Sequence, residues 1–173
     1  MAQRAGAGAG AGRGAGVVLF DGVCNMCNGG VDFMVRWEAA RRPGEPPLRF
    51  AALQSEPGRA LLQECGRAPD DISSIVLVAG GAGGGGGRAR GLGGPEAGSD
   101  FWIKSEAILR IAQECRAPLP WLAAALHLLP LTFRDAVYDF VAANRYSVFG
   151  RRDECRLGAG ALGAERFAGR FLE

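Results

Sequence analysis

Apolar runs and helical stretches alternate along the first part of this chain. The run at Val17–Phe20 is typical of a short buried strand, and it ends at Asp21 and Gly22. From about Asn25 to Ala40 the period becomes helical, because polar side chains recur at every fourth position opposite an apolar side. Prolines between residues 43 and 47 forbid further helix. The pattern therefore predicts a strand followed directly by an amphipathic helix.

The same alternation continues through the middle of the chain. Residues 48–53 form a second strand-like run. Ser55 is suited to cap a short helix that runs through Cys65 and stops at Gly66. Residues 72–78 are rich in β-branched side chains and predict a third strand.

The last part of the chain predicts one more strand and then helices. Residues 101–104 are the fourth strand-like run, and Ser105 is suited to cap a helix that reaches about Cys115. Prolines bound a helical segment between residues 118 and 130. Thr132 with Asp135 resembles a capping box that begins a long final helix.

These elements give the order β-α-β-α-β-β-α with two additional C-terminal helices, an α/β fold. The first two βα crossovers imply parallel neighbouring strands with right-handed connections. Strands three and four are suited to an antiparallel hairpin. We expect Trp102, Trp121 and the leucines of 122–131 to lie in the core, with an apolar face on the final helix made by Phe133, Val137, Phe140 and Val141.

Three segments are too rich in glycine and alanine, or too weakly patterned, to predict order. They are residues 1–16, an insert at 80–99, and a flexible tail at 158–173. The insert is expected to bulge from a turn, since the entropy of loop closure grows slowly with length. One domain is therefore expected over residues 17–157.

Composition narrows the functional classes. The chain has 173 residues, of which 48% are hydrophobic, and a net charge of +2. Its positive charges are scattered, which argues against a nucleic-acid binder. The apolar stretch at 118–131 is too short and too bounded by prolines to insert stably in a membrane. Five widely spread cysteines do not fit a secreted disulfide scaffold, so we expect an intracellular location.

The two closely spaced cysteines are the strongest chemical signal. Cys24 falls where the first strand gives way to the first helix, so unpaired N–H groups and the helix dipole favour its thiolate. Cys27 follows one turn later, within reach of a mixed disulfide on Cys24. The spacing therefore predicts that Cys24 attacks a disulfide and Cys27 resolves the product, with no bound cofactor and with electrons from a thiol donor.

Alternatives to redox chemistry stay open for these cysteines. Cysteine is a common small core residue, which is a sufficient account of Cys65 and Cys115. A metal- or cluster-binding protein would combine Cys24 and Cys27 with Cys155, although zinc commonly needs four ligands. A third interpretation is a non-catalytic binding or assembly module that uses the last two helices.

Asp21 also has two interpretations. Asp-Gly is a favourable turn pair for closing a strand. A carboxylate at this place can also take the proton of Cys27 during resolution, while its charge raises the pKa of nearby thiols. We therefore count Asp21 with the cysteines as a candidate catalytic residue.

Several ordered motifs over residues 17 to about 157 resemble the DCC family of thiol-disulfide oxidoreductases, most of all its plant-type members. The motifs are "FDGVCNMCNGGVDF", "RFAALQS", "APDDISSIVLV", "IKSEAILRI" and "FRDAVYDFVAANRYSVFGRRDEC". The family is named for a D-x-x-C-x-x-C pattern, here Asp21, Cys24 and Cys27. The resemblance implies a thioredoxin-like fold, protein-disulfide reductase activity on protein or small-molecule disulfides, and a plastid as an alternative to the cytoplasm.

The resemblance also implies auxiliary residues and shows departures. Matching positions suggest a place near the site for Ser105 with Glu106, for Arg145 with Tyr146, and for Cys155. Thioredoxins place a cis-proline before the third strand, where this chain has Ser73 and Ser74. Phe20 stands where the family often has tyrosine, which removes a hydroxyl group but keeps the aromatic ring.

Overall fold

The computed structural model describes residues 14–40, 46–80, 101–152 and 169–172. Four strands and five helices are described within these ranges. In chain order they are β1 (Gly14–Phe20), α1 (Asn25–Trp37), β2 (Arg49–Ala52), α2 (Glu56–Glu64), β3 (Val76–Gly80), β4 (Phe101–Ile103), α3 (Lys104–Gln113), α4 (Leu119–Leu126) and α5 (Leu131–Phe149). The predicted order of elements is confirmed.

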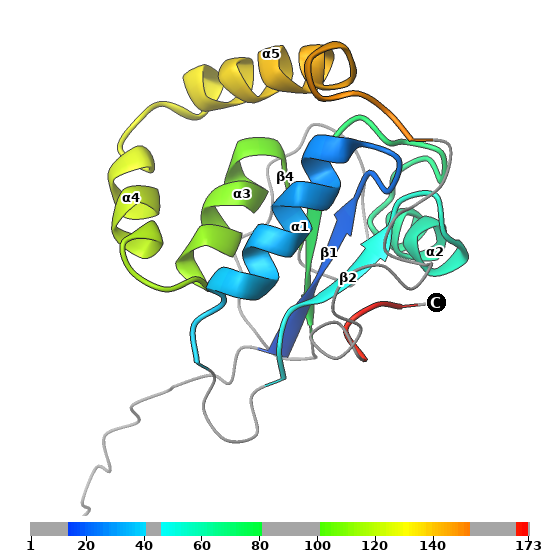
Figure 1. The fold of residues 1–173 in the computed structure, drawn as a ribbon, viewed down its shortest axis with the longest axis horizontal. Coiled ribbons are helices and arrows are strands. Elements are labelled where there is room, and N and C mark those ends of the chain that lie inside the picture. The colour runs from blue at the N-terminus through cyan, green and yellow to red at the C-terminus, as the bar shows by residue number, and fades with distance from the viewer. Residues whose placement is uncertain (1–13, 41–45, 81–100, 153–168, 173) are drawn as a thin grey trace, which may run out of the picture.

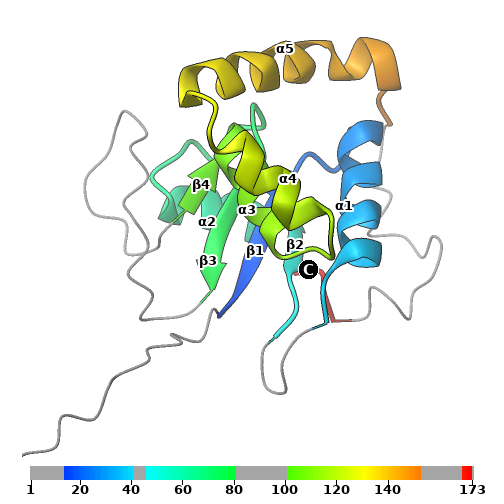
Figure 2. The ribbon, with the colours of Figure 1, turned by 90° about the vertical axis from the view of Figure 1, so that its left-hand side faces the viewer.

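The four strands form one sheet in the order β2-β1-β3-β4 (Figures 1 and 2). β1 pairs in parallel with β2, as the first crossover predicts, and β3 with β4 makes the expected antiparallel pair. The expectation for the second crossover is wrong, because β3 lies beside β1 and runs antiparallel to it. This arrangement is thioredoxin-like, and it places the ends of β1 and β2 at one edge of the sheet.

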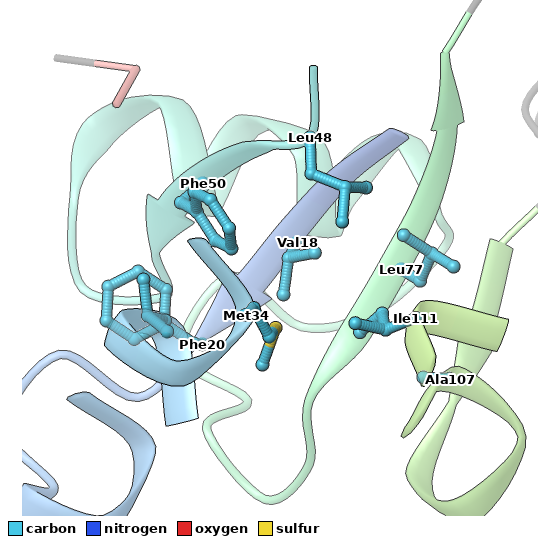
Figure 3. Packing of buried hydrophobic residues seen from close by; sticks show 9 residues of the cluster. Val18, Phe20, Met34, Leu48, Phe50, Leu77, Ala107 and Ile111 are labelled. Carbon is cyan, nitrogen blue, oxygen red and sulfur yellow. The ribbon is translucent and has the colours of Figure 1, made fainter. Parts of the chain in front are cut away.

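Apolar side chains pack on both faces of the sheet. On one face, Val18, Phe20 and Phe50 meet Met34 of α1 and Ile111 of α3 (Figure 3). The other face is covered by α2, which contributes Leu62 and its capping residue Cys65. Side chains alternate between the two faces of a strand, so the short run Val17–Phe20 supplies both cores.

The predicted ends of the domain differ from the structure. β1 begins at Gly14, before the expected start at residue 17, because this stretch continues its pairing toward Gly80 of β3. The prediction of a flexible tail is wrong for residues 169–172. The Phe50 N–H donates to the Arg170 carbonyl at 2.7 Å, and the Phe171 ring packs 5.8 Å from the Phe50 ring. The predicted disorder of 1–13, 81–99 and 158–168 concerns residues outside those described.

Helices α4 and α5 do not form core in the expected way. They lie outside the α1 and α3 layer, with α5 stretched across its upper end (Figure 2). Trp121 is 76% exposed and Leu128 is 87% exposed, so the expected burial of Trp121 and of the leucines of 122–131 is wrong. The predicted apolar face of α5, including Phe140, also points to solvent.

Two predicted helix caps are wrong for one shared reason. α3 begins at Lys104 and α5 at Leu131, and neither has a side-chain cap. The Ser105 hydroxyl instead donates to Asp135 Oδ1, which joins the two helices. Asp135 Oδ1 also accepts the Ser105 N–H at 3.3 Å, so this carboxylate bonds to α3 and not to the start of its own helix.

Candidate functional site

The N-terminus of α1 places Cys24 as the sequence predicts. Cys24 is the N-cap residue, with φ −83° and ψ 122°, and its Sγ accepts the Cys27 N–H at 3.4 Å. The side chain of Asn28 donates to the Cys24 carbonyl at 2.8 Å and to the Gly22 carbonyl at 2.7 Å. These bonds hold the two cysteines one turn apart at the positive end of the helix.

The two thiols differ in accessibility. Cys24, the expected attacking thiol, is the less accessible of the two. Cys24 is fully buried, whereas Cys27 is only half-buried. A short segment, Phe149–Arg152, which we call the strap, pairs with the backbone on both sides of Cys24. The Arg152 N–H donates to the Val23 carbonyl at 2.9 Å, and the Asn25 side chain donates to the Phe149 carbonyl at 2.9 Å. Arg151 pairs with Cys24 as an antiparallel bridge.

Cys27 lies in the wall of a cavity of about 210 Å³. The cavity lies between α1, the segment before β3, α3 and α5. Two of its lining residues, Ile108 of α3 and Val141 of α5, are each 41% exposed and mark its mouth. Most of the lining side chains are apolar, and the full set is Phe20, Asp21, Met26, Cys27, Gly30, Met34, Ile72, Ser74, Ile75, Ile108, Tyr138, Val141, Ala142 and Arg145.

Asp21 is the buried centre of a hydrogen-bond network at the end of β1. Its Oδ1 accepts the Gln54 side-chain N–H at 2.7 Å and the Val23 N–H at 3.2 Å. Its Oδ2 accepts Arg145 at 3.1 Å and the Tyr146 hydroxyl. Both oxygens are therefore engaged, so the carboxylate anchors α5 to the strand end that carries Cys24.

Electrostatics at the pair oppose ionisation of Cys27. Burial is the main cause that raises the pKa of Cys27 to about 12, followed by its hydrogen bond with Cys24 and the charges of Cys24 and Asp21. The nearby Arg145 guanidinium acts in the opposite direction. Cys27 is therefore protonated at neutral pH, and its attack on a disulfide requires a base that takes its proton.

The auxiliary candidate residues lie in different parts of the fold, and not all of them are near the cysteine pair. Ser74 is buried and lines the cavity, while Ser73 bonds to Asp71 on the surface. Ser105 lies at the contact of α3 with α5 and is not a lining residue. Cys155 lies outside the described residues. Within the described ranges, no three histidine, cysteine, aspartate or glutamate side chains are grouped to hold a metal ion, and no helix is long and apolar enough to cross a membrane.

Two residues of the site, Gln54 and Tyr138, were not singled out from the sequence. Gln54 lies beyond the end of β2, and its contact with Asp21 follows from the parallel pairing of β1 with β2. Tyr138 lies on α5, and its hydroxyl accepts the Ile75 N–H at 2.9 Å. A tyrosine on this helix was the available signal, but its partner depends on how α5 lies against the segment before β3.

Comparisons with known proteins agree on one family. The family model described as DCC1-like thiol-disulfide oxidoreductase matches residues 18–151. A chloroplastic DCC family protein of Arabidopsis thaliana is 45% identical over 141 residues, which cover 82% of this chain and 69% of that protein. The uncharacterized protein YuxK of Bacillus subtilis is 35% identical over 142 residues, covering 82% of this chain and 85% of that protein. No solved structure matches the chain.

Proposed function

We propose that this chain, which belongs to the DCC1-like thiol-disulfide oxidoreductase family, exchanges disulfides through Cys24 and Cys27. The observation that carries the proposal is the geometry of the pair. Cys24 Sγ caps α1 and accepts the Cys27 N–H at 3.4 Å, and Cys27 lies in the cavity wall. A thiolate at a helix N-terminus beside a second thiol is the arrangement that dithiol exchange requires.

In the proposed cycle Cys27 meets the substrate first. Cys24 takes the proton of Cys27 as the Cys27 sulfur attacks one sulfur of a substrate disulfide, which releases one thiolate and leaves a mixed disulfide on Cys27. Cys24 then attacks Cys27 Sγ, its proton passes to the departing sulfur, and the second half of the substrate leaves as a thiol. The substrate gains two electrons, and the pair becomes a Cys24–Cys27 disulfide. This order reverses the roles expected from spacing, because Cys24 is fully buried beside the strap while Cys27 lines the cavity.

Regeneration of the dithiol needs an external thiol donor, which reduces the Cys24–Cys27 disulfide in the reverse sequence of exchanges. The proposal invokes no bound cofactor. The family resemblance implies reduction of protein or small-molecule disulfides. A plastid location is supported by the chloroplastic relative, and uptake of the chain by isolated chloroplasts tests it.

The proposal is tested by steady-state reduction of bis(2-hydroxyethyl) disulfide with dithiothreitol as donor. We expect turnover by the wild type and loss of at least about a hundredfold in Cys24→Ser and in Cys27→Ser, since each removes one of the two exchanging sulfurs. Cys65→Ser is the matched control, because Cys65 belongs to the opposite face of the sheet. Equal rates in all four proteins would contradict catalysis and favour the binding module.

A further inference from the structure

We propose that the cavity beside Cys27 binds an uncharged, ring-sized apolar group of a low-molecular-mass disulfide. The inference rests on the proposed function, because it identifies the substrate class of the same site. It is carried by three features of the described residues: the lining of the cavity, the pairing of its charges, and the occupation of nearby backbone groups by α5 and α3.

The lining fits an apolar ligand of limited size. Met26 and Met34 of α1 face Ile72 and Ile75 of the segment before β3, and Val141 of α5 lies at the mouth. Methionine side chains adapt to ligands of varied shape and contact aromatic rings favourably. An apolar cavity of about 150 Å³ is enough to hold benzene. The volume of about 210 Å³ therefore suits a ring or a short branched alkyl group.

Most polar side chains in the wall have partners, and among the lining residues only the Arg145 Nε is buried without a hydrogen bond. Asp21 and Arg145 form a buried ion pair at 3.1 Å. The Ser74 hydroxyl accepts Arg67 at 3.2 Å, and the Tyr138 hydroxyl accepts the Ile75 N–H at 2.9 Å. A charged ligand would lose its hydration and find no unpaired opposite charge among these groups, which disfavours it. Disulfides of charged peptides such as glutathione are therefore poor candidates.

An extended peptide has few backbone groups with which to pair beside Cys27. The Ile75 N–H is bonded to Tyr138, and the Ile75 carbonyl accepts the Lys104 N–H at 3.3 Å. The Ile72 carbonyl accepts Arg145 at 3.1 Å. Recognition of a peptide by strand addition requires free N–H and C=O groups at such an edge. α5 and the start of α3 thus direct the site toward a small molecule.

The test measures the modification of Cys27 by methanethiosulfonates in the Cys24→Ser variant. A thiolate attacks the substituted sulfur, the protein gains a mixed disulfide, and methanesulfinate leaves whatever the substituent is. Rates for the neutral benzyl reagent and the anionic 2-sulfonatoethyl reagent are each divided by their rates with free cysteine. We expect the normalised benzyl rate to be at least about tenfold higher, as burial of the ring predicts.

Two surface variants of α5 test the place of binding. Val141→Asp puts a charge at the mouth of the cavity, and it should slow the benzyl reagent about tenfold. Val148→Asp is the matched control, because Val148 lies on the same helix, is 68% exposed and does not line the cavity. Circular dichroism checks that both variants are folded.

The outcomes separate this inference from the proposed function. Equal normalised rates for the two reagents, equal slowing by both aspartate variants, or faster wild-type turnover of insulin than of a neutral aryl disulfide would overturn the inference. Selective labelling of Cys27 needs no turnover. Benzyl selectivity in a protein that reduces no disulfide would therefore support the cavity and reject the oxidoreductase proposal, whereas turnover without selectivity would do the reverse.

Discussion

Asp21 and Arg145 form a buried ion pair at 3.1 Å although 124 residues separate them in the chain. Asp21 directly follows β1 in the turn that leads to Cys24, and Arg145 lies on the helix that forms one wall of the cavity. The Tyr146 hydroxyl donates to the same carboxylate. The pair therefore couples the position of α5 to the redox segment, and breaking it should affect both the stability and the site.

We expect Asp21→Asn to lower the free energy of unfolding by about 3–5 kcal/mol, because it leaves the Arg145 charge buried and unpaired. Asp32→Asn is the control, since Asp32 pairs with Arg36 on the surface and its loss should cost less than about 1 kcal/mol. Urea denaturation measures both variants. Equal effects would show that the buried pair does not anchor α5.

The raised pKa of Cys27 gives a pH dependence with a definite sign. Its folded value of about 12 lies above the ordinary value of 9.0, so the unfolded chain loses this proton first as the pH rises. The contribution is fully present below pH 9.0 and is lost as the pH rises toward about 12. We expect Cys27→Ser to flatten the fall in unfolding free energy over that window.

Cys65, which lies away from the site, independently tests how a raised thiol pKa makes the unfolding free energy depend on pH. Burial, with a smaller contribution from Glu64, raises its pKa to about 11. Cys65→Ser should therefore remove a part of the alkaline destabilisation that ends nearer pH 11. Urea titrations at intervals between pH 8 and 12 distinguish the variants. A slope unchanged by both substitutions would be inconsistent with raised thiol pKa values.

The order of attack is decided by trapping the mixed disulfide. With the resolving sulfur removed, Cys24→Ser should accumulate a stable adduct on Cys27, because no second thiol displaces the substrate. Cys27→Ser should react at least about tenfold more slowly, since Cys24 is fully buried beside the strap. Mass spectrometry of the intact protein quantifies both adducts. Accumulation in Cys27→Ser alone would restore the order in which Cys24 attacks.

The strap itself can be loosened at one glycine. Gly150 has φ 80°, and an added Cβ would lie 3.2 Å from Asn25 Nδ2, so Gly150→Ala should strain the strap by about 1 kcal/mol. We expect faster alkylation of Cys24 by iodoacetamide, by about fivefold for that energy. Peptide mapping assigns the labelled cysteine.

Gly66→Ala is the matched control for the strap. Gly66 has φ 69° with no atom within 4 Å of an added Cβ, and it follows α2 far from the strap in sequence. The substitution imposes comparable backbone strain and should leave the labelling of Cys24 unchanged. Equal acceleration in both variants would indicate general destabilisation and would argue against a role of the strap in covering Cys24.

Local patterns predicted the elements that depend on neighbouring residues. The strand at Val17–Phe20, its end at Asp21 and the helix that begins after Cys24 follow from apolar runs, a turn pair and helical period. The same patterns failed for α4 and α5. Trp121 and Leu128 are of residue types common in protein cores, yet they are exposed. The reason is that a helical period shows which face of a helix is apolar but not what packs against that face.

The candidate site also has one part that the sequence predicts and one part that depends on the tertiary structure. By itself the sequence determined that two thiols stand one turn apart at a helix N-terminus, since strand, turn and helix are set within a few residues. Only the tertiary structure decided which thiol is accessible. The strap at Cys24 and the wall of α5 beside Cys27 come from residues more than 100 positions away. Their placement depends on long-range pairs such as Asp21 with Arg145, which no local period encodes.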